Sequence, residues 1–213
     1  MSSIHPEIRD LVRELTKKIW ENRTPMELSH IASALNGLQY MESNEKEVQQ
    51  ILKALARKLR ENTESINSYS IGNGLSGLQK MDCKDVEVRE ILLTMARKIA
   101  TTPHQISVGA LCSALHSLQR KSYSNGEVKA LLSAVGSKIA TCHGKLTSRQ
   151  MSHALYGMQK MDSNVAEVRG ILWALSKLIS EVESTLRSQD IGLCLYGLKS
   201  MNCESAERII RHK

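Results

Sequence analysis

Apolar residues recur along this chain with the spacing of helices, and the pattern returns every forty residues. Ile71, Leu75 and Leu78 stand at positions i, i+4 and i+7, which share one face of a helix. The equivalent sets are Ile31, Leu35 and Leu38; Leu111, Leu115 and Leu118; Met151, Leu155 and Met158; and Ile191, Leu195 and Leu198. No alternating, β-branched stretch competes with this pattern. We therefore expect one helix here in every unit, the first helix, with these positions in the core.

A second helical segment follows each first helix. The stretch EVQQILKALARKL, from Glu47, has equivalents that begin at Glu7, Glu87, Glu127 and Glu167. Two helices per forty residues predict an all-α, right-handed α-solenoid of about five 40-residue helix-turn-helix repeats, a single domain in which each repeat packs on its neighbours. The expected units are approximately 1–22 (partial), 23–62, 63–102, 103–142, 143–182 and 183–213.

Polar residues indicate where these helices begin. Asn67, Ser107 and Thr147 are the expected N-caps of first helices. The residue before each cap is apolar and should form a hydrophobic staple; the staple positions are Met26, Ile66, Ile106, Leu146 and Leu186. Second helices carry sequences typical of capping boxes, namely Asn44 with Glu47, Ser124 with Glu127 and Asn164 with Glu167.

Small residues occupy two columns of the first helix. One column reads Ala34, Gly74, Ala114, Ala154 and Cys194, and the other reads Gly37, Gly77, Ser117, Gly157 and Gly197. A glycine inside a helix costs about 1 kcal/mol relative to alanine. Its recurrence predicts that a neighbouring helix passes too close for a side chain.

The repeated phrase, seen as LNGLQYM, LSGLQKM and LYGMQKM, precedes the E-V-x-x-[IL]-L-x-x-[LM] pattern of the second helix. Together they resemble the octotricopeptide and heptatricopeptide-type repeats of RNA-binding proteins. The resemblance covers nearly the whole chain and is carried mostly by packing residues. It implies sequence-selective binding of single-stranded RNA along the inner helices.

The side of the first helix opposite the core changes from unit to unit. This ridge holds four of the five tyrosines, two histidines and several cations. Its candidate binding residues are Ser33, Asn36, Tyr40, Tyr69, Asn73, Ser76, Lys80, Ser113, His116, Arg120, Arg149, His153, Tyr156, Lys160 and Tyr196. Rings that stack bases, short polar groups and cations are what single-strand recognition uses. The columns of Ser33 and Asn36 would select bases, and the column of Tyr40 would contact phosphates.

A second hypothesis fits the same ridge, because Tyr, Arg and His are also common at protein interfaces. In that case the chain is a protein-protein interaction scaffold that grips a partner peptide or helix on the same concave face. The final segment, ESAERIIRHK, is too short to cover the last repeat, so we expect either that the array continues beyond Lys213 or that copies associate end to end through the C-terminal repeat.

Composition narrows these alternatives only a little. The net charge of +7 over 213 residues admits a polyanionic partner. Five cysteines without a C-x-x-C pair favour reduced thiols, and hence a cytosol or an organelle interior. No run approaches the length of a membrane span, so no membrane contact is expected.

Little in the sequence points to catalysis, and no catalytic residue, cofactor or metal is predicted. Cys112 and His116, with Cys142 and His143, could imitate a zinc site. However, Cys112 stands in a column of small residues and is expected to be packed. The recurring basic residues of the second helix are interpreted as solvated surface, and those near helix C-termini are expected to complement the helix dipole; they include Lys18, Lys58, Lys98 and Lys138.

Overall fold

The computed structural model describes residues 5–142, 144–182 and 185–201, and its regular elements in this part are all α-helices. The helices are α1 (Pro6–Glu21), α2 (Leu28–Gly37), α3 (Lys46–Glu61), α4 (Ser68–Gly77), α5 (Val86–Thr101), α6 (Val108–His116), α7 (Gly126–Ile139), α8 (Ser148–Gly157), α9 (Ala166–Ser180) and α10 (Ser188–Gly197). Even-numbered helices are the first helices of the units, and odd-numbered helices are the second helices. The all-α prediction is confirmed.

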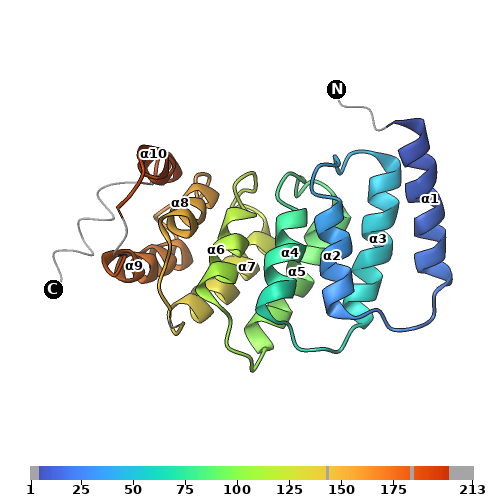
Figure 1. Cartoon of the computed structure of the whole chain (residues 1–213), viewed down its shortest axis with the longest axis horizontal. Helices are drawn as coiled ribbons and strands as arrows, with labels where there is room; N and C mark the ends of the chain where they lie inside the picture. The colour runs from blue at the N-terminus through green and yellow to red at the C-terminus, as the bar shows by residue number, and fades with distance from the viewer. Residues whose placement is uncertain (1–4, 143, 183–184, 202–213) are drawn as a thin grey trace.

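The helices form two layers that extend along the molecule (Figure 1). In one layer α2, α4, α6, α8 and α10 pack in succession, and in the other α1, α3, α5, α7 and α9 do the same. The layers contact each other through α2 with α3, α4 with α5 and α6 with α7. This packing between neighbouring helices is consistent with a helical repeat.

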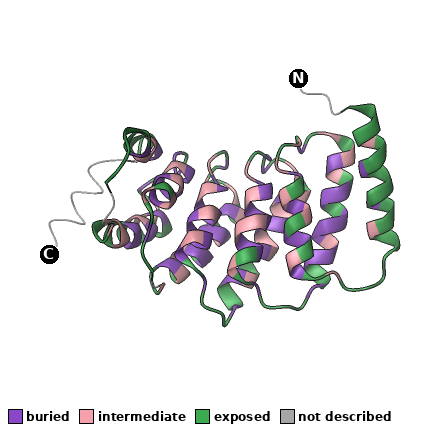
Figure 2. Cartoon of the chain, viewed as in Figure 1, coloured by how far each residue is buried: buried purple, intermediate pink, exposed green. Residues whose placement is uncertain are grey.

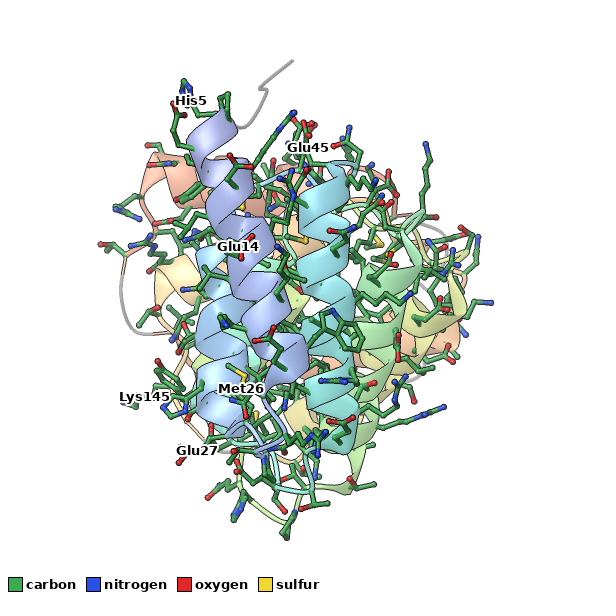
Figure 3. The ribbon with its side chains drawn as sticks, turned by 90° about the vertical axis from the view of Figure 1, so that its right-hand side faces the viewer. His5, Glu14, Met26, Glu27, Glu45 and Lys145 are labelled. Carbon is green, nitrogen blue, oxygen red and sulfur yellow. The ribbon has the colours of Figure 1, made fainter. Side chains whose placement is uncertain are left out.

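Figure 3 looks along the array from its α1 end, with Glu14 on the middle of α1. Met26, Glu27 and Lys145 lie toward one edge, where second helices lead into first helices. His5 and Glu45, which precede α1 and α3, lie at the opposite edge. The connection from a first helix to the second helix of its unit therefore lies at this opposite edge, where the first helices end.

The predicted core positions are buried in four of the five first helices, with Ile71, Leu75 and Leu78 fully enclosed. The prediction was wrong for the set in α10, where Leu195 is 65% exposed and Ile191 and Leu198 are also exposed (Figure 2). Helices α2, α4 and α6 each contact a second helix as well as the next first helix, whereas α10 packs mainly against α8 within the described residues.

The predicted caps of the first helices are confirmed. The side chains of Asn67, Ser107 and Thr147 each accept a hydrogen bond from the backbone N–H three residues later. Thr147 and Gln150 form a complete capping box. The staple positions Ile66, Ile106 and Leu146 are buried, Met26 is half-buried and Leu186 is exposed.

The capping boxes predicted for the second helices at Asn44, Ser124 and Asn164 were wrong. Helices α3, α7 and α9 begin two residues later, after N-caps whose side chains form no cap hydrogen bond; these N-caps are Glu45, Asn125 and Val165. The backbone of the three preceding residues forms a turn, in which the N–H of the N-cap donates to the carbonyl three residues earlier. The predicted caps lie inside this turn, so they are not placed to cap the helix.

Glycines stand where adjacent first helices touch, as predicted. A Cβ atom on Gly77 would collide with the carbonyl group of Leu35, and one on Gly197 would collide with that of Leu155. On Gly37 a Cβ would meet nothing within 4 Å. In the third unit Ser117 takes the glycine position. There α6 ends one residue early, at His116, and the buried hydroxyl donates to a backbone carbonyl at 2.6 Å.

Three of the four recurring lysines of the second helices, Lys58, Lys98 and Lys138, are not solvated surface, contrary to the prediction. Lys58 is only 3% exposed, and its ammonium donates to the carbonyls of Asn22 and Thr24. Lys98 and Lys138 reach the equivalent C-terminal residues of the preceding second helices, Asn62 and Thr102. A helix end leaves carbonyls without partners, and these ammonium groups satisfy them across the boundary between units. Lys18, on α1, is exposed.

Lys121 replaces the methionine that ends the phrase in the other units. It is 1% exposed, and its ammonium donates to the carbonyls of Leu78, Met81 and Ser117 at 2.7, 3.2 and 3.1 Å. Burial lowers its pKa to about 8, because a charged group is less stable away from water. The equivalent Met81 and Met161 are buried apolar residues.

Candidate functional site

The ridge residues of successive first helices lie side by side. The hydroxyls of Ser33 on α2 and Tyr69 on α4 are 3.1 Å apart. Gln79, just after α4, lies 3.2 Å from Nε2 of His116 on α6. Nδ1 of His116 in turn lies 3.1 Å from the carbonyl oxygen of His153 on α8. The ridge is therefore one continuous strip across α2, α4, α6 and α8.

Four rings of the strip touch one another, and we call them the ring file: His116, His153, Tyr156 and Tyr196. The imidazoles of His116 and His153 stack with centroids 4.6 Å apart and planes 17° apart. The centroids of His116 and Tyr156 are 6.0 Å apart, and those of Tyr156 and Tyr196 are 5.7 Å apart. The file extends the strip from α6 to α10.

Hydrogen bonding determines which nitrogen of His116 carries the proton. A carbonyl oxygen can only accept, so Nδ1 must donate to His153, and Nε2 then accepts from the amide of Gln79. Burial lowers the pKa of His116, partly opposed by the bond to the carbonyl. Burial also lowers the pKa of His153, with further contributions from His116 and Arg149. Both imidazoles are therefore favoured in the neutral form.

Three exposed cations run beside the strip, and we call them the cation row: Lys80, Arg120 and Lys160. They follow α4, α6 and α8 in turn. The ammonium of Lys160 donates to the carbonyl of Arg120 at 3.4 Å, and that of Lys80 lies 4.5 Å from the ring centre of Tyr40. The row thus continues from unit to unit.

A groove of ≈ 580 Å³ opens beside the start of the cation row. Tyr40, Lys80 and Arg120 line it together with carboxylates that include Asp82 and Asp85. The carboxylate of Asp82 also accepts the backbone N–H of Lys84 at 3.0 Å, so it has a local structural role in the turn. The groove is therefore of mixed charge.

The N-terminal part of the strip differs in chemistry from the ring file. Its remaining polar side chains are short and half-buried; they are Asn36, Asn73, Ser76 and Ser113. None of the four makes a side-chain hydrogen bond to another residue that the structure describes. Tyr69 is 56% exposed in this section. Arg149 is exposed at the start of α8, near His153.

Gln79 and Lys199 belong to the strip but were missed from the sequence. Gln79 is part of the repeated phrase, and its recurrence as Gln39, Gln119 and Gln159 made it resemble a packing residue. Lys199 donates to the hydroxyl of Tyr196 at 2.8 Å, with its ammonium 4.0 Å from the ring centre. The sequence could have indicated Lys199, because this residue falls next to the ridge positions on a helical wheel.

Cys112 is buried, as predicted, and burial raises the pKa of its thiol to about 12. Over the described residues, no group of three or more His, Cys, Asp or Glu side chains is arranged to hold a metal ion. His143 lies outside the described residues. No helix of the described part is long and apolar enough to cross a bilayer.

Fold and surface together define an all-helical protein, with packing consistent with a helical repeat, that carries a polar and aromatic strip along one layer. No protein-family model, curated protein or solved structure matches the chain.

Proposed function

We propose that this chain is a right-handed α-solenoid of about five repeats that binds single-stranded RNA on the surface of its first helices. The observation that carries the proposal is the continuous strip of rings and short polar groups beside the cation row. The resemblance to octotricopeptide and heptatricopeptide-type repeats points to the same ligand.

Each part of this surface supports one element of single-strand recognition. Aromatic rings stack with bases of any sequence, and each stacked base contributes about 1–3 kcal/mol. The cations of Lys80, Arg120 and Lys160 suit a phosphate backbone that follows the row. In repeat proteins of this kind, two or three side chains per unit read one base.

A second candidate function has its own observation. On the core side of α10 Leu195 is largely exposed, and an apolar side chain there suits a partner peptide or helix better than a phosphate chain. A protein-protein interaction scaffold would use the same surface of the first helices as the RNA. End-to-end self-association through the C-terminal repeat, which contains α10, also stays a prediction.

The two candidates differ in how binding depends on salt. We expect the chain to bind a mixed-sequence, single-stranded RNA of about 20 nucleotides, with an affinity that falls by about 0.7 log units per log unit of salt for each phosphate contacted. Replacing Lys80, Arg120 and Lys160 together with Gln should reduce this slope by about 2. Fluorescence anisotropy between 50 and 200 mM salt, the range over which such contacts weaken markedly, measures it.

The matched control replaces three exposed cations of the second-helix layer, Lys46, Lys53 and Arg97, with Gln. This variant has the same net charge as the first but should keep the slope of the unmodified protein. Equal slopes for the two variants would contradict a role for the cation row. Absence of RNA binding at low salt, with a protein retained from lysate through the strip, would favour the scaffold.

A further inference from the structure

We infer that the strip selects a base in its N-terminal section, where Tyr69, Asn36, Asn73 and Ser76 form a position for one adenine. The ring file from His116 to Tyr196 then stacks bases without selecting them. This inference rests on the proposed function and concerns which residues of the strip determine sequence preference.

The rings of the file are already in contact with one another. A base inserted between two rings needs about 6.8 Å between them, twice the spacing of about 3.4 Å found between stacked bases. The centroids of His116 and His153 are 4.6 Å apart, and those of Tyr156 and Tyr196 are 5.7 Å apart. A ligand can therefore lie over the file, but it cannot be held between its rings unless they separate.

Much of the hydrogen-bonding capacity of the file is also in use. Nδ1 of His116 donates to the carbonyl of His153, and Nε2 accepts from Gln79. The hydroxyl of Tyr196 accepts from Lys199. Base edges are read by free donors and acceptors, so His116 and Tyr196 are poorly suited to select a base.

The N-terminal section has the opposite properties. Tyr69 is more than half exposed, and no ring or cation is stacked on it within the described residues. Its hydroxyl lies 3.1 Å from that of Ser33, which fixes the ring on the surface. Tyr69 is thus a single, oriented stacking face for one base.

Unused amides lie next to this face. Asn73 is one helical turn after Tyr69, and Ser76 is on the following turn of α4. The backbone of Asn36, on α2, lies against Gly77 of α4, the residue after Ser76. An asparagine amide presents a donor beside an acceptor, which matches N6 and N7 of adenine.

Fluorescence anisotropy with 15-nucleotide oligomers of A, U and C tests the inference. We expect the unmodified chain to prefer oligo-A by about tenfold, the range of one bidentate contact. Asn73→Ala should reduce this preference to within about twofold, because it removes the amide that would pair with N6 and N7 of adenine. Tyr69→Leu should weaken binding of oligo-A by about tenfold, since it removes the stacking face.

Tyr156→Phe is the matched control, because it removes one polar group from the ring file and keeps the ring. It should retain the preference for oligo-A. The inference is overturned if Tyr156→Phe loses the preference, if Asn73→Ala keeps it, or if the unmodified chain binds the three oligomers equally. Failure to bind all three would instead refute the proposed function. Circular dichroism melting verifies that each variant is folded.

Discussion

The carbonyl oxygen of Leu115, on α6, occupies the space that a Cβ atom on Gly157 of α8 would need. The distance between this oxygen and such a Cβ atom would be well below the 3.0 Å that real Cβ contacts keep. The obstacle is a backbone atom, which cannot rotate away. The same close approach links Gly77 to Leu35 and Gly197 to Leu155. Adjacent first helices are therefore as close as their backbones allow, which brings the ridge residues into a single strip.

Replacing Gly157 with Ala should destabilise the chain by about 1–3 kcal/mol, because α8 must move away from α6 to admit the methyl group. Urea denaturation followed by circular dichroism measures the change. Gly37→Ala is the control, since its Cβ meets nothing within 4 Å, and it should be neutral or stabilising by up to about 1 kcal/mol. Equal effects of the two substitutions would contradict the close approach as the reason for glycine.

Replacing Lys121 with Met should stabilise the chain at pH 7 by about 1–4 kcal/mol. The substitution restores the apolar residue of the other units and removes a buried charge that has no carboxylate partner among its hydrogen bonds. Thermal or urea unfolding measures the gain. Lys84→Met, at an exposed position, should change stability little. A destabilised Lys121→Met variant would show that the three carbonyl contacts outweigh the cost of burying the ammonium.

The lowered pKa of Lys121 predicts that the stability of the fold depends on pH. Its pKa is about 8 in the folded chain and about 10.4 when unfolded, so between these values the unfolded state binds more protons. Stability contributed by this residue should therefore increase as the pH rises from 8 to 10.4. The difference in unfolding free energy between the unmodified chain and Lys121→Met should shrink across this range. A constant difference would be inconsistent with a lowered pKa.

The two stacked imidazoles, of His116 and His153, predict that acid lowers the stability of the fold. The pKa values of His116 and His153 are lowered in the folded chain, mainly by burial, so the unfolded state binds protons first as the pH falls. Stability should decrease as the pH drops below about 6.5, the ordinary value for histidine. Unfolding midpoints in urea between pH 7.5 and 5 measure this decrease.

The control for this prediction compares two substitutions. His116→Gln combined with His153→Gln should flatten the profile below pH 6.5, whereas His30→Gln, at an exposed position, should leave it unchanged. A profile that is the same in all three proteins would exclude the stacked pair as the source of the acid effect.

Patterns that depend on local spacing could be predicted from the sequence. The two helices per unit, the N-caps of the first helices, the core columns of four units and the glycine contacts all follow from side-chain size and polarity within a few residues. The capping boxes of the second helices failed because backbone turns, formed by the three preceding residues, compete with a side-chain cap.

What the sequence by itself determined is the repeat, its helices and the chemistry available on the ridge. The tertiary structure alone decided which of those residues meet. Equivalent residues are forty positions apart in the chain, but the three hydrogen bonds that link neighbouring units along the strip join residues 36 or 37 apart. His116 therefore meets His153, from a different column. Lys58 and Lys121 are buried for the same kind of reason, because the carbonyls they satisfy include those of Asn22, Leu78 and Met81 in the preceding units.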